Sequence, residues 1–388
     1  MKLTFISNYL NHHQSALCEA FYRELGGNFR FVACMPVPQS RRQLGYMDLH
    51  QKEYVIRAYE NQNCKNEAMA WCMESDVIIH GAAPEVVAAN RIKLGLPVFR
   101  YSERVFKNGL IHAISPKGRK KLKMLHSQYK NEKVYMLCSS AYTAKDMSRV
   151  GAYKNKAFRW GYFPEVKTYE NIDTLIAQKE PSSILWVARL IELKHPEAAI
   201  EVARRLKKDG YSFKLSMIGI GPMQEQLEQM ISKEGLGDCV ELLGAMSPEE
   251  VRAHMEKAEI FLFNSDRHEG WGAVMNESMN SGCAVVASHI VGSVPFLIHD
   301  GVNGLIYRDG NVKDLYKKVK FLLDNPAKRS DMGKAAYGTM ADQWNAENAA
   351  KRFIQLAEAV CQGEEQLDIF SDGVCSRAPL LKDGWYKP

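Results

Sequence analysis

Short apolar segments recur along the whole chain and alternate with longer segments in which apolar and polar residues are mixed. In the first half, such segments predict buried strands at residues 2–7, 29–35, 76–80, 97–101 and 135–138. In the second half they predict strands at residues 183–188, 214–219, 240–243, 260–263 and 284–287. The longer segments, such as Ser15–Leu25, predict helices. This alternation is typical of α/β folds, so we expect one doubly wound parallel sheet in each half.

A polar stretch at residues 165–181 separates the two series of predicted elements. It carries several charged side chains and is expected to connect two domains. We therefore predict a Rossmann-like domain at residues 1–164 and a second one at residues 182–345. Residues 346–388 begin with a further predicted helix and end in a tail to which no structure is assigned.

The composition supports two globular domains and excludes several classes of protein. The 388 residues are 46% apolar and 25% charged, which excludes wholesale disorder. The formal net charge of +6 is too small to indicate a nucleic-acid partner, although it suits an anionic ligand or a membrane surface.

The cysteines and the apolar runs bear on the compartment. Nine scattered cysteines form no C-x-x-C pair and show no His/Cys ligand spacing, which indicates a reducing compartment and no zinc site. The first ten residues become polar too early for a signal peptide, and no apolar run approaches the roughly 20 residues that cross a bilayer. We expect a cytoplasmic protein, with peripheral contact to the inner face of the cytoplasmic membrane left open.

Residues 260–287 hold the strongest candidate for a functional site. A predicted strand, Ile260–Phe263, leads into a polar turn, a helix at Ala273–Asn280 and a second strand. Ligands bind where parallel strands end, and this turn holds Glu269, followed by Glu277 in the helix. Close backbone contact with a ligand is expected at Gly270, Trp271, Gly272 and Ala273. The pattern fits a nucleotide sugar, with Glu269 on the donor sugar, the start of the helix on the diphosphate and Glu277 on the ribose.

This stretch resembles the signature of a known enzyme family. Its residues fit the S-x3-E-G-[FW]-G-x4-E pattern of retaining GT-B glycosyltransferases of family 4 (glycosyl transferases group 1), at Ser265, Glu269, Gly270, Trp271, Gly272 and Glu277. The resemblance implies two Rossmann-like domains facing each other across a cleft, with the helix at residues 346–359 returning to the first domain. A solvated pair of glutamates on an exposed helix is the structural alternative.

The resemblance also implies an activity. It implies transfer of a hexose-type sugar, with retention, from a nucleotide sugar to a saccharide or lipid-linked acceptor in surface polysaccharide or glycan assembly. UDP-sugar is the expected donor and GDP-sugar the second choice, and neither a metal ion nor another cofactor is expected. A non-catalytic sugar-nucleotide-binding protein and a sugar-nucleotide epimerase of the same fold remain open.

Further candidates in the second half lie where other predicted strands end. Arg189 and Lys194 belong to ARLIELKHPE, which resembles the family's G-R-L-x3-K-G segment with Ala188 and His195 in place of the glycines. We expect the two cations to bind the diphosphate and to stabilise it as it leaves, and two ordinary surface cations are the alternative. Backbone contacts with the donor are expected at Gly219, Gly221, Gly244, Gly292 and Ser293.

Candidates in the first half also follow predicted strands. His80 ends one strand and is assigned to catalysis, with a buried core imidazole as the alternative. The loop after the first strand carries His12 and His13, and Glu103 and Arg104 follow another strand. In the resembled family this side faces the acceptor.

A basic segment lies at residues 115–133. It contains seven lysines and arginines and a single acid, Glu132, with apolar residues between them. An amphipathic basic helix of this kind can contact anionic lipid, and a solvated helix face is the alternative.

Overall fold

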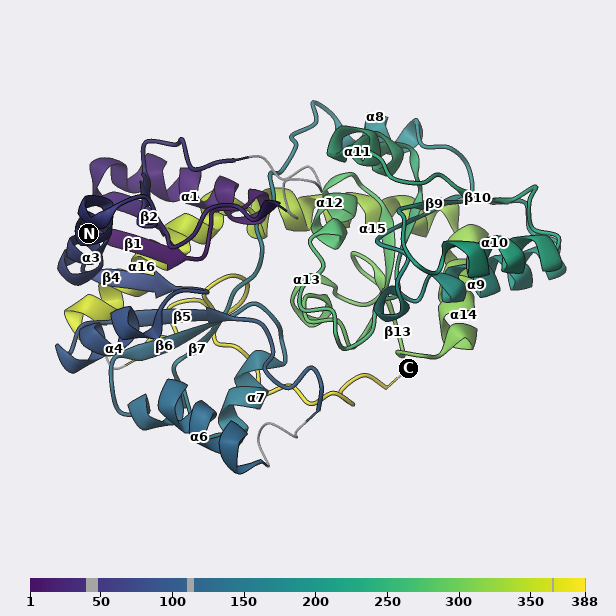
Figure 1. Ribbon diagram of the computed structural model, residues 1–388. Helices are drawn as coiled ribbons and strands as arrows, with labels where there is room; N and C mark the ends of the chain where they lie inside the picture. Colours follow the sequence, from purple (N-terminus) through teal and green to yellow (C-terminus); the bar gives the residue numbers. More distant parts are fainter. Residues whose placement is uncertain (40–47, 110–114, 365, 388) are drawn as a thin grey trace. The chain divides into compact units, whose positions relative to one another are not determined.

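The computed structural model of the chain describes residues 1–39, 48–109, 115–364 and 366–387. The backbone forms two compact units. Unit 1 contains Met1–Glu165 and Trp344–Lys382, and unit 2 contains Val166–Gln343 and the residues from Asp383 onward. Each unit is built around one parallel sheet, so the predicted α/β class with two Rossmann-like domains is confirmed (Figure 1).

The sheet of unit 1 has the strand order β3-β2-β1-β4-β5-β6-β7 among the described residues. Its strands are β1 (Leu3–Ser7), β2 (Phe29–Ala33), β3 (Val55–Arg57), β4 (Val77–His80), β5 (Val98–Ser102), β6 (Val134–Cys138) and β7 (Ala157–Arg159). The order reverses direction between β1 and β4, and ligands of such sheets bind at this switch point. The sequence pattern does not predict β3 and β7, because three residues are too few to show a periodicity.

Helices cover both faces of this sheet. They are α1 (His12–Leu25), α3 (Gln62–Glu74), α4 (Glu85–Lys93), α6 (Pro116–Leu125), α7 (Thr143–Arg149) and α16 (Ala346–Gln362). The rings of Phe21 on α1 and Phe99 on β5 both contact Phe353 of α16, so α1 and α16 share one face (Figure 1). Apolar residues of α3, α4 and α7 pack on the other face.

Helix α1 begins at His12, three residues earlier than predicted, because Asn11 caps it. The Asn11 side chain accepts a hydrogen bond from the backbone N–H of His13 at 3.0 Å. The two histidines of this loop therefore belong to the first turn of a helix.

The tail protects the edge of the unit 1 sheet. Backbone hydrogen bonds join Ser376 and Cys375 to Arg159 of β7, at 2.8 and 2.9 Å, and a third joins Ala378 to Ala157 at 3.0 Å. An uncovered edge strand is a template for pairing with other chains, so this segment supplies a cover that the sequence pattern does not predict.

The sheet of unit 2 has the order β10-β9-β8-β11-β12-β13 among the described residues. Its strands are β8 (Ser183–Val187), β9 (Lys214–Ile218), β10 (Val240–Leu242), β11 (Ile260–Phe263), β12 (Ala284–Ser288) and β13 (Leu305–Tyr307). The order reverses between β8 and β11, which places the switch point of unit 2 there.

Helices also cover both faces of this sheet. They are α8 (Ile172–Ala177), α9 (Pro196–Lys208), α10 (Gln224–Lys233), α11 (Pro248–Lys257), α12 (Val274–Asn280), α13 (Val294–Leu297), α14 (Val312–Asp324) and α15 (Pro326–Gly338). Apolar side chains of α9, α10 and α14 pack with the strands in one core. Helices α11, α12 and α15 form a second group, in which α12 contacts both of its neighbours.

The stretch expected to connect the domains is largely part of unit 2, where it forms α8. Lys179, one of the charged residues of this stretch, is only 6% exposed. Its ammonium donates hydrogen bonds to four backbone carbonyl oxygens, those of Met255, Glu256, Ala258 and Ser281, at 2.8–3.1 Å. The stretch is thus anchored inside the unit.

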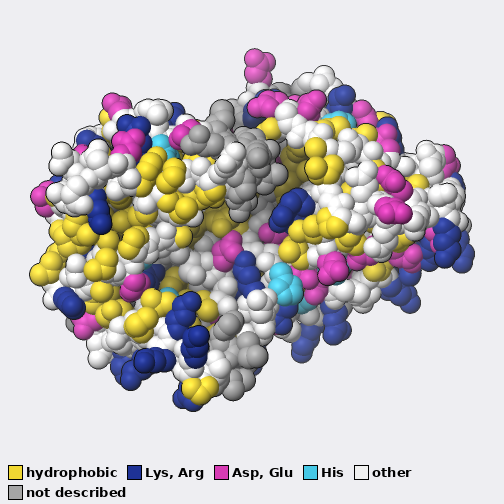
Figure 2. Space-filling model, in the orientation of Figure 1, with side chains coloured by type: hydrophobic (Ala, Val, Ile, Leu, Met, Phe, Trp, Pro, Cys, Tyr) yellow, Lys and Arg dark blue, Asp and Glu magenta, His cyan; other side chains and the backbone are white. Residues whose placement is uncertain are grey.

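Helix α6 carries the first part of the basic segment, including Lys117, Arg119, Lys120, Lys121 and Lys123. Its lysines and arginine are exposed, whereas Leu122 is buried against unit 1. Figure 2 shows dark blue side chains gathered over this helix. In the described part of the chain, no helix combines the length and the apolar character that crossing a bilayer requires.

Candidate functional site

The loops after β8 and β11 adjoin at the switch point of unit 2. The backbone N–H of Asp266 donates to the carbonyl oxygen of Leu193 at 2.9 Å, and the Asn264 side chain donates to the carbonyl oxygen of His195 at 2.7 Å. The indole N–H of Trp186 donates a hydrogen bond to Oδ1 of Asn264 at 2.6 Å. These contacts fix the two predicted donor-binding segments side by side.

Two of the predicted site residues form an ion pair across these loops. The ammonium of Lys194 contacts the carboxylate of Glu269, and the two side chains are 14% and 15% exposed. The Ser265 hydroxyl donates to Oε2 of the same carboxylate at 3.3 Å. The structure therefore joins a predicted phosphate ligand and the predicted sugar ligand, which are 75 positions apart in the chain.

Arg189 and Glu277 differ from this pair because their charged groups have no protein partner among the described residues. Arg189 is exposed where β8 ends, and its guanidinium makes no hydrogen bond or ion pair there. The Glu277 carboxylate likewise accepts no hydrogen bond from the described residues, and burial raises its pKa while the charge of Arg252 opposes that shift. Both groups are thus available to a ligand.

The predicted glycines of this region have a packing role. Gly219 has a φ of +142°, and a Cβ added to it would lie 1.8 Å from the carbonyl oxygen of Ala188. A Cβ on Gly221 would lie 2.4 Å from the carbonyl oxygen of Leu190. These glycines let the loop after β9 lie directly against the loop that carries Arg189 and Lys194. The N–H of Gly219 also donates to the carbonyl oxygen of Gly244 at 2.7 Å, which ties in the loop after β10.

The remaining predicted donor contacts surround the start of α12. The Trp271 side chain is fully buried, and its indole N–H donates to Asn276 Oδ1 at 2.9 Å, so only its backbone can reach a ligand. Gly272 has a φ of +79°, in the region that favours glycine. The Ser293 hydroxyl donates to the Trp271 carbonyl oxygen and joins the loop after β12 to this turn.

His195 occupies the place of the second glycine in the resembled pattern. Its φ of 48° and ψ of 51° are left-handed, which histidine tolerates better than most residues. Its imidazole contacts Glu197 at 2.8 Å and Asp266 at 3.5 Å, and the hydrogen bond to Glu197 is the main cause of its raised pKa. Two carboxylates thus hold the ring in this conformation.

Unit 1 has a pocket of about 480 Å³ at its own switch point. Its lining includes the segments after β1 and β4, where the sheet order reverses. His80, which ends β4, does not line this pocket. It is 4% exposed, its Nε2 lies 3.2 Å from the carbonyl oxygen of Pro84, and burial lowers its pKa. These are the surroundings of a core histidine, and they give no support to a catalytic role.

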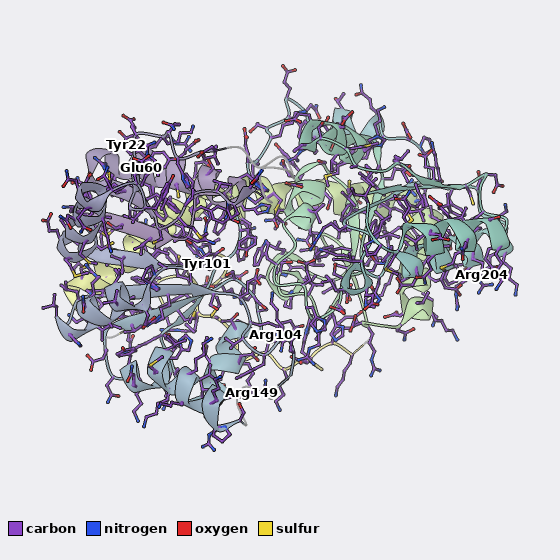
Figure 3. The ribbon with its side chains drawn as sticks, in the orientation of Figure 1. Tyr22, Glu60, Tyr101, Arg104, Arg149 and Arg204 are labelled. Atoms are coloured by element: carbon purple, nitrogen blue, oxygen red, sulfur yellow. The ribbon has the colours of Figure 1, made fainter. Side chains whose placement is uncertain are left out.

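Glu103 and Arg104 separate in the structure. Glu103 lines the pocket, whereas Arg104 is 3% exposed and its Nε lies 3.5 Å from Oδ2 of the buried Asp146. The sequence analysis did not single out Tyr101 or Tyr162, which also line the pocket. Tyr101 comes from the end of β5 (Figure 3), and Tyr162 follows β7. Their position at or just after the carboxyl ends of strands in one sheet is the signal that could have identified them.

The described residues include no group of three or more His, Cys, Asp or Glu side chains placed to hold a metal ion.

Most of unit 2 is similar to a known family of enzymes. Residues 169–339 match the model of the family Glycosyl transferases group 1. This range contains Arg189, Lys194, Glu269 and Glu277. The amylovoran biosynthesis glycosyltransferase AmsK of Erwinia amylovora is 32% identical over 212 residues, which are 53% of this chain and 51% of that protein. The chain thus spans about half the length of this relative.

Solved structures resemble the chain over nearly its whole length. HepE of Anabaena, crystallised with UDP, has a TM-score of 0.67 and 15% identity, covering 92% of this chain and 100% of that one. The lipopolysaccharide outer core galactosyltransferase WaaB has a TM-score of 0.66 and 16% identity, covering 93% and 99%. The chain therefore has the GT-B fold of these proteins, and residues 169–339 are similar to the glycosyl transferases of group 1.

Proposed function

We propose that the protein transfers a hexose-type sugar from a nucleotide sugar to a saccharide or lipid-linked acceptor, with retention and without a metal ion. The observation that carries the proposal is the Lys194–Glu269 pair, which lies at the switch point of a nucleotide-binding fold. Arg189 and Glu277 supply two further ionisable groups whose charged ends have no partner among the residues that the structure describes. The similarity to AmsK supports a role in surface polysaccharide assembly, and the UDP bound to HepE supports UDP-sugar as the first donor to test, before GDP-sugar.

The two cations fit the diphosphate. Arg189 can present its planar fork to two phosphate oxygens, and Lys194 can act as a point charge. Negative charge grows on the departing nucleoside diphosphate as the bond to the sugar breaks, so fixed cations lower the barrier more than they favour the ground state. In this proposal Arg189 and Lys194 together stabilise the charge that other transferases stabilise with a metal ion.

The two carboxylates divide the remaining contacts. Glu277, whose raised pKa reflects burial, accepts hydrogen bonds from the ribose hydroxyls, which would satisfy a desolvated acceptor. Glu269 contacts the donor sugar beside Lys194. Backbone N–H groups from Gly270 to Ala273, together with those of Gly292 and Ser293, supply further contacts.

Retention follows if the acceptor attacks the face from which the diphosphate departs. The acceptor hydroxyl oxygen forms its bond to the anomeric carbon while the bond from that carbon to the phosphate oxygen breaks. The hydroxyl proton passes to the departing phosphate, so no separate base is required. We also propose that the basic face of α6 contacts anionic lipid, which co-sedimentation with vesicles containing an anionic phospholipid would test.

Thermal-shift binding in the presence of EDTA tests the donor site. We expect one nucleoside diphosphate, and the sugar nucleotide that contains it, to raise the melting temperature. We expect this shift to be lost in Glu277→Ala and in the double variant Arg189→Ala/Lys194→Ala. Glu192→Gln is a matched control, because Glu192 is an exposed carboxylate in the same loop as Lys194.

Donor hydrolysis separates catalysis from binding alone. We expect slow hydrolysis of the sugar nucleotide that binds, and its loss in Glu269→Ala. Binding without hydrolysis or transfer to any acceptor would favour the non-catalytic alternative. No shift with any nucleotide would overturn the donor site.

A further inference from the structure

The pocket of unit 1 is built from the loops that leave one edge of its sheet. Asn8, Asn11 and His13 follow β1, Gly81 follows β4, Glu103 follows β5, and Tyr162 follows β7. Such an edge, at a switch point, is where α/β sheets bind small ligands. Nothing in the donor site of unit 2 requires this second pocket.

A fixed carboxylate is the one acidic group of the pocket lining. The Tyr162 hydroxyl donates to Oε1 of Glu103 at 2.6 Å, and the ammonium of Lys107 contacts Oε2. Each carboxylate oxygen has a second acceptor site, so this arrangement orients Glu103 without exhausting it. A ligand that donates hydrogen bonds is therefore favoured over one that only accepts them.

An aromatic wall stands beside this carboxylate. The His13 ring stacks on the Tyr162 ring, with centroids 5.6 Å apart and planes 10° from parallel. Tyr101 meets Tyr162 edge to face at 6.2 Å. The His13 Nδ1 atom is buried and has no hydrogen-bond partner in the described structure. A buried polar atom without a partner is costly, and a ligand hydroxyl would satisfy it.

The charges of the lining argue against an anionic ligand. Burial lowers the pKa of His13 to about 3, so its ring is neutral near pH 7. The only cation that contacts Glu103 among the described residues, Lys107, is engaged by that carboxylate. A phosphate or carboxylate placed here would meet a negative charge and, among the described lining residues, no free positive one.

We propose that this pocket binds an electrically neutral sugar ring, namely the acceptor sugar of the proposed transfer. Ring hydroxyls donate to Glu103 and bond to Nδ1 of His13, and the side-chain amides of Asn8 and Asn11 supply further donors and acceptors. The inference rests on the proposed function for the identity of the sugar as acceptor. Its chemical class, a neutral hydroxyl-rich ring rather than a sugar phosphate or a uronic acid, rests on the pocket alone.

Saturation-transfer NMR on the full chain tests the class. The probes are the methyl glycosides of glucose, galactose and mannose, compared with glucose 1-phosphate and methyl glucuronide. We expect saturation transfer to at least one neutral glycoside, and a signal at least fivefold smaller for the two anions. Glu103→Gln should weaken the neutral glycoside about tenfold, as expected for one hydrogen bond to a charged group.

Two more variants keep the result interpretable. Tyr162→Phe keeps the ring but removes the hydroxyl that orients Glu103, and should weaken binding several-fold even if Glu103→Gln does not fold. Glu74→Gln is the control, because Glu74 is an exposed carboxylate of unit 1 that also pairs with a lysine, Lys2. It should leave binding unchanged.

Donor hydrolysis makes the two proposals fail separately. Suppose that the chain hydrolyses the donor. The pocket inference is then overturned, and the proposed transferase activity stands, under any of three results. These are no binding of a neutral glycoside, equal binding of the anions, or unchanged glycoside binding in both Glu103→Gln and Tyr162→Phe. Glycoside binding that both variants weaken, without hydrolysis of the donor, would support the ligand class of the pocket and count against the proposed transferase activity. If Glu103→Gln weakens the binding of a UDP-sugar but not that of UDP, the pocket holds the donor sugar and the acceptor assignment is wrong.

Discussion

Replacing Glu269 by glutamine separates the two roles of the Lys194–Glu269 pair. Glu269 neutralises Lys194, a cation that we assign to the diphosphate. A nucleotide must therefore compete with this carboxylate for Lys194. Glu269→Gln frees Lys194 and at the same time removes the carboxylate that we assign to the donor sugar. We expect tighter binding of UDP, which has no sugar, and loss of donor hydrolysis.

The burial of the pair sets the size of the effect. The side chains of Lys194 and Glu269 are 14% and 15% exposed, so solvent screens the attraction between their charges less than it would in a fully exposed pair. Exposed pairs contribute up to about 1 kcal/mol, and a hydrogen bond to a charged group about 1.5–3 kcal/mol. We take about 1 kcal/mol as the cost of drawing Lys194 away, which converts to about a fivefold decrease in the Kd of UDP.

Isothermal titration with UDP in EDTA measures this difference. Glu269→Gln should bind UDP about fivefold more tightly than the unmodified chain, and Lys194→Met at least about tenfold more weakly. Glu192→Gln, the control in the same loop, should bind as the unmodified chain does. If Glu269→Gln weakens UDP as much as Lys194→Met, the carboxylate positions Lys194 for the phosphate and our argument from competition is refuted.

Three further predictions concern stability. The contact with Glu197 raises the pKa of His195, so it stabilises the fold fully below about pH 6.5. This stabilisation is lost as the pH rises through the higher pKa of the folded state. The melting temperature of His195→Asn should therefore fall further below that of the unmodified chain at pH 6 than at pH 9. Gly219→Ala should lower the free energy of unfolding by about 3 kcal/mol or more, since its Cβ would overlap a carbonyl oxygen. Gly244→Ala, which has open space around its Cβ but a φ of +71°, should lower it by about 1 kcal/mol. Urea unfolding measures both values, and equal losses would contradict the argument. Lys179→Met orphans buried carbonyl oxygens and should cost about 3 kcal/mol, while UDP binding by the folded protein is kept.

Much of the fold could be predicted from the sequence because buried parallel strands are apolar throughout. The strand Ile260–Phe263 has the predicted bounds, and the other nine predicted strands match within two residues at each end. The features that the sequence does not predict include some that depend on long-range contacts. Strand β7 is three residues long and pairs with a tail segment more than 200 positions away. Lys179 looks like a linker residue in the sequence, but folding supplies four carbonyl oxygens for its ammonium.

The candidate site divides in the same way. Glu269 and Lys194 could be predicted because each lies in a motif with a recognisable spacing, and their contact follows from the adjacency of β8 and β11. The pocket of unit 1 has no such motif, since each loop contributes only one to a few residues and strand order decides which loops meet. His80 shows the limit most clearly. A strand-end histidine can turn toward a ligand or into the core, and only packing decides between them.

The two units differ in the charge they offer a ligand, and this difference supports opposite roles. Within the described parts of the chain, unit 2 presents Arg189 without a protein partner and Lys194 held by a single carboxylate, so an anionic diphosphate gains attraction there. Among the described residues, unit 1 presents Glu103 with its one contacting cation engaged and His13, which stays neutral near pH 7, so the same diphosphate would lose its hydration without gaining a partner from them. Specificity of this kind needs repulsion as well as attraction. In our proposal, a nucleotide sugar therefore binds to unit 2 and a neutral sugar binds in the pocket of unit 1.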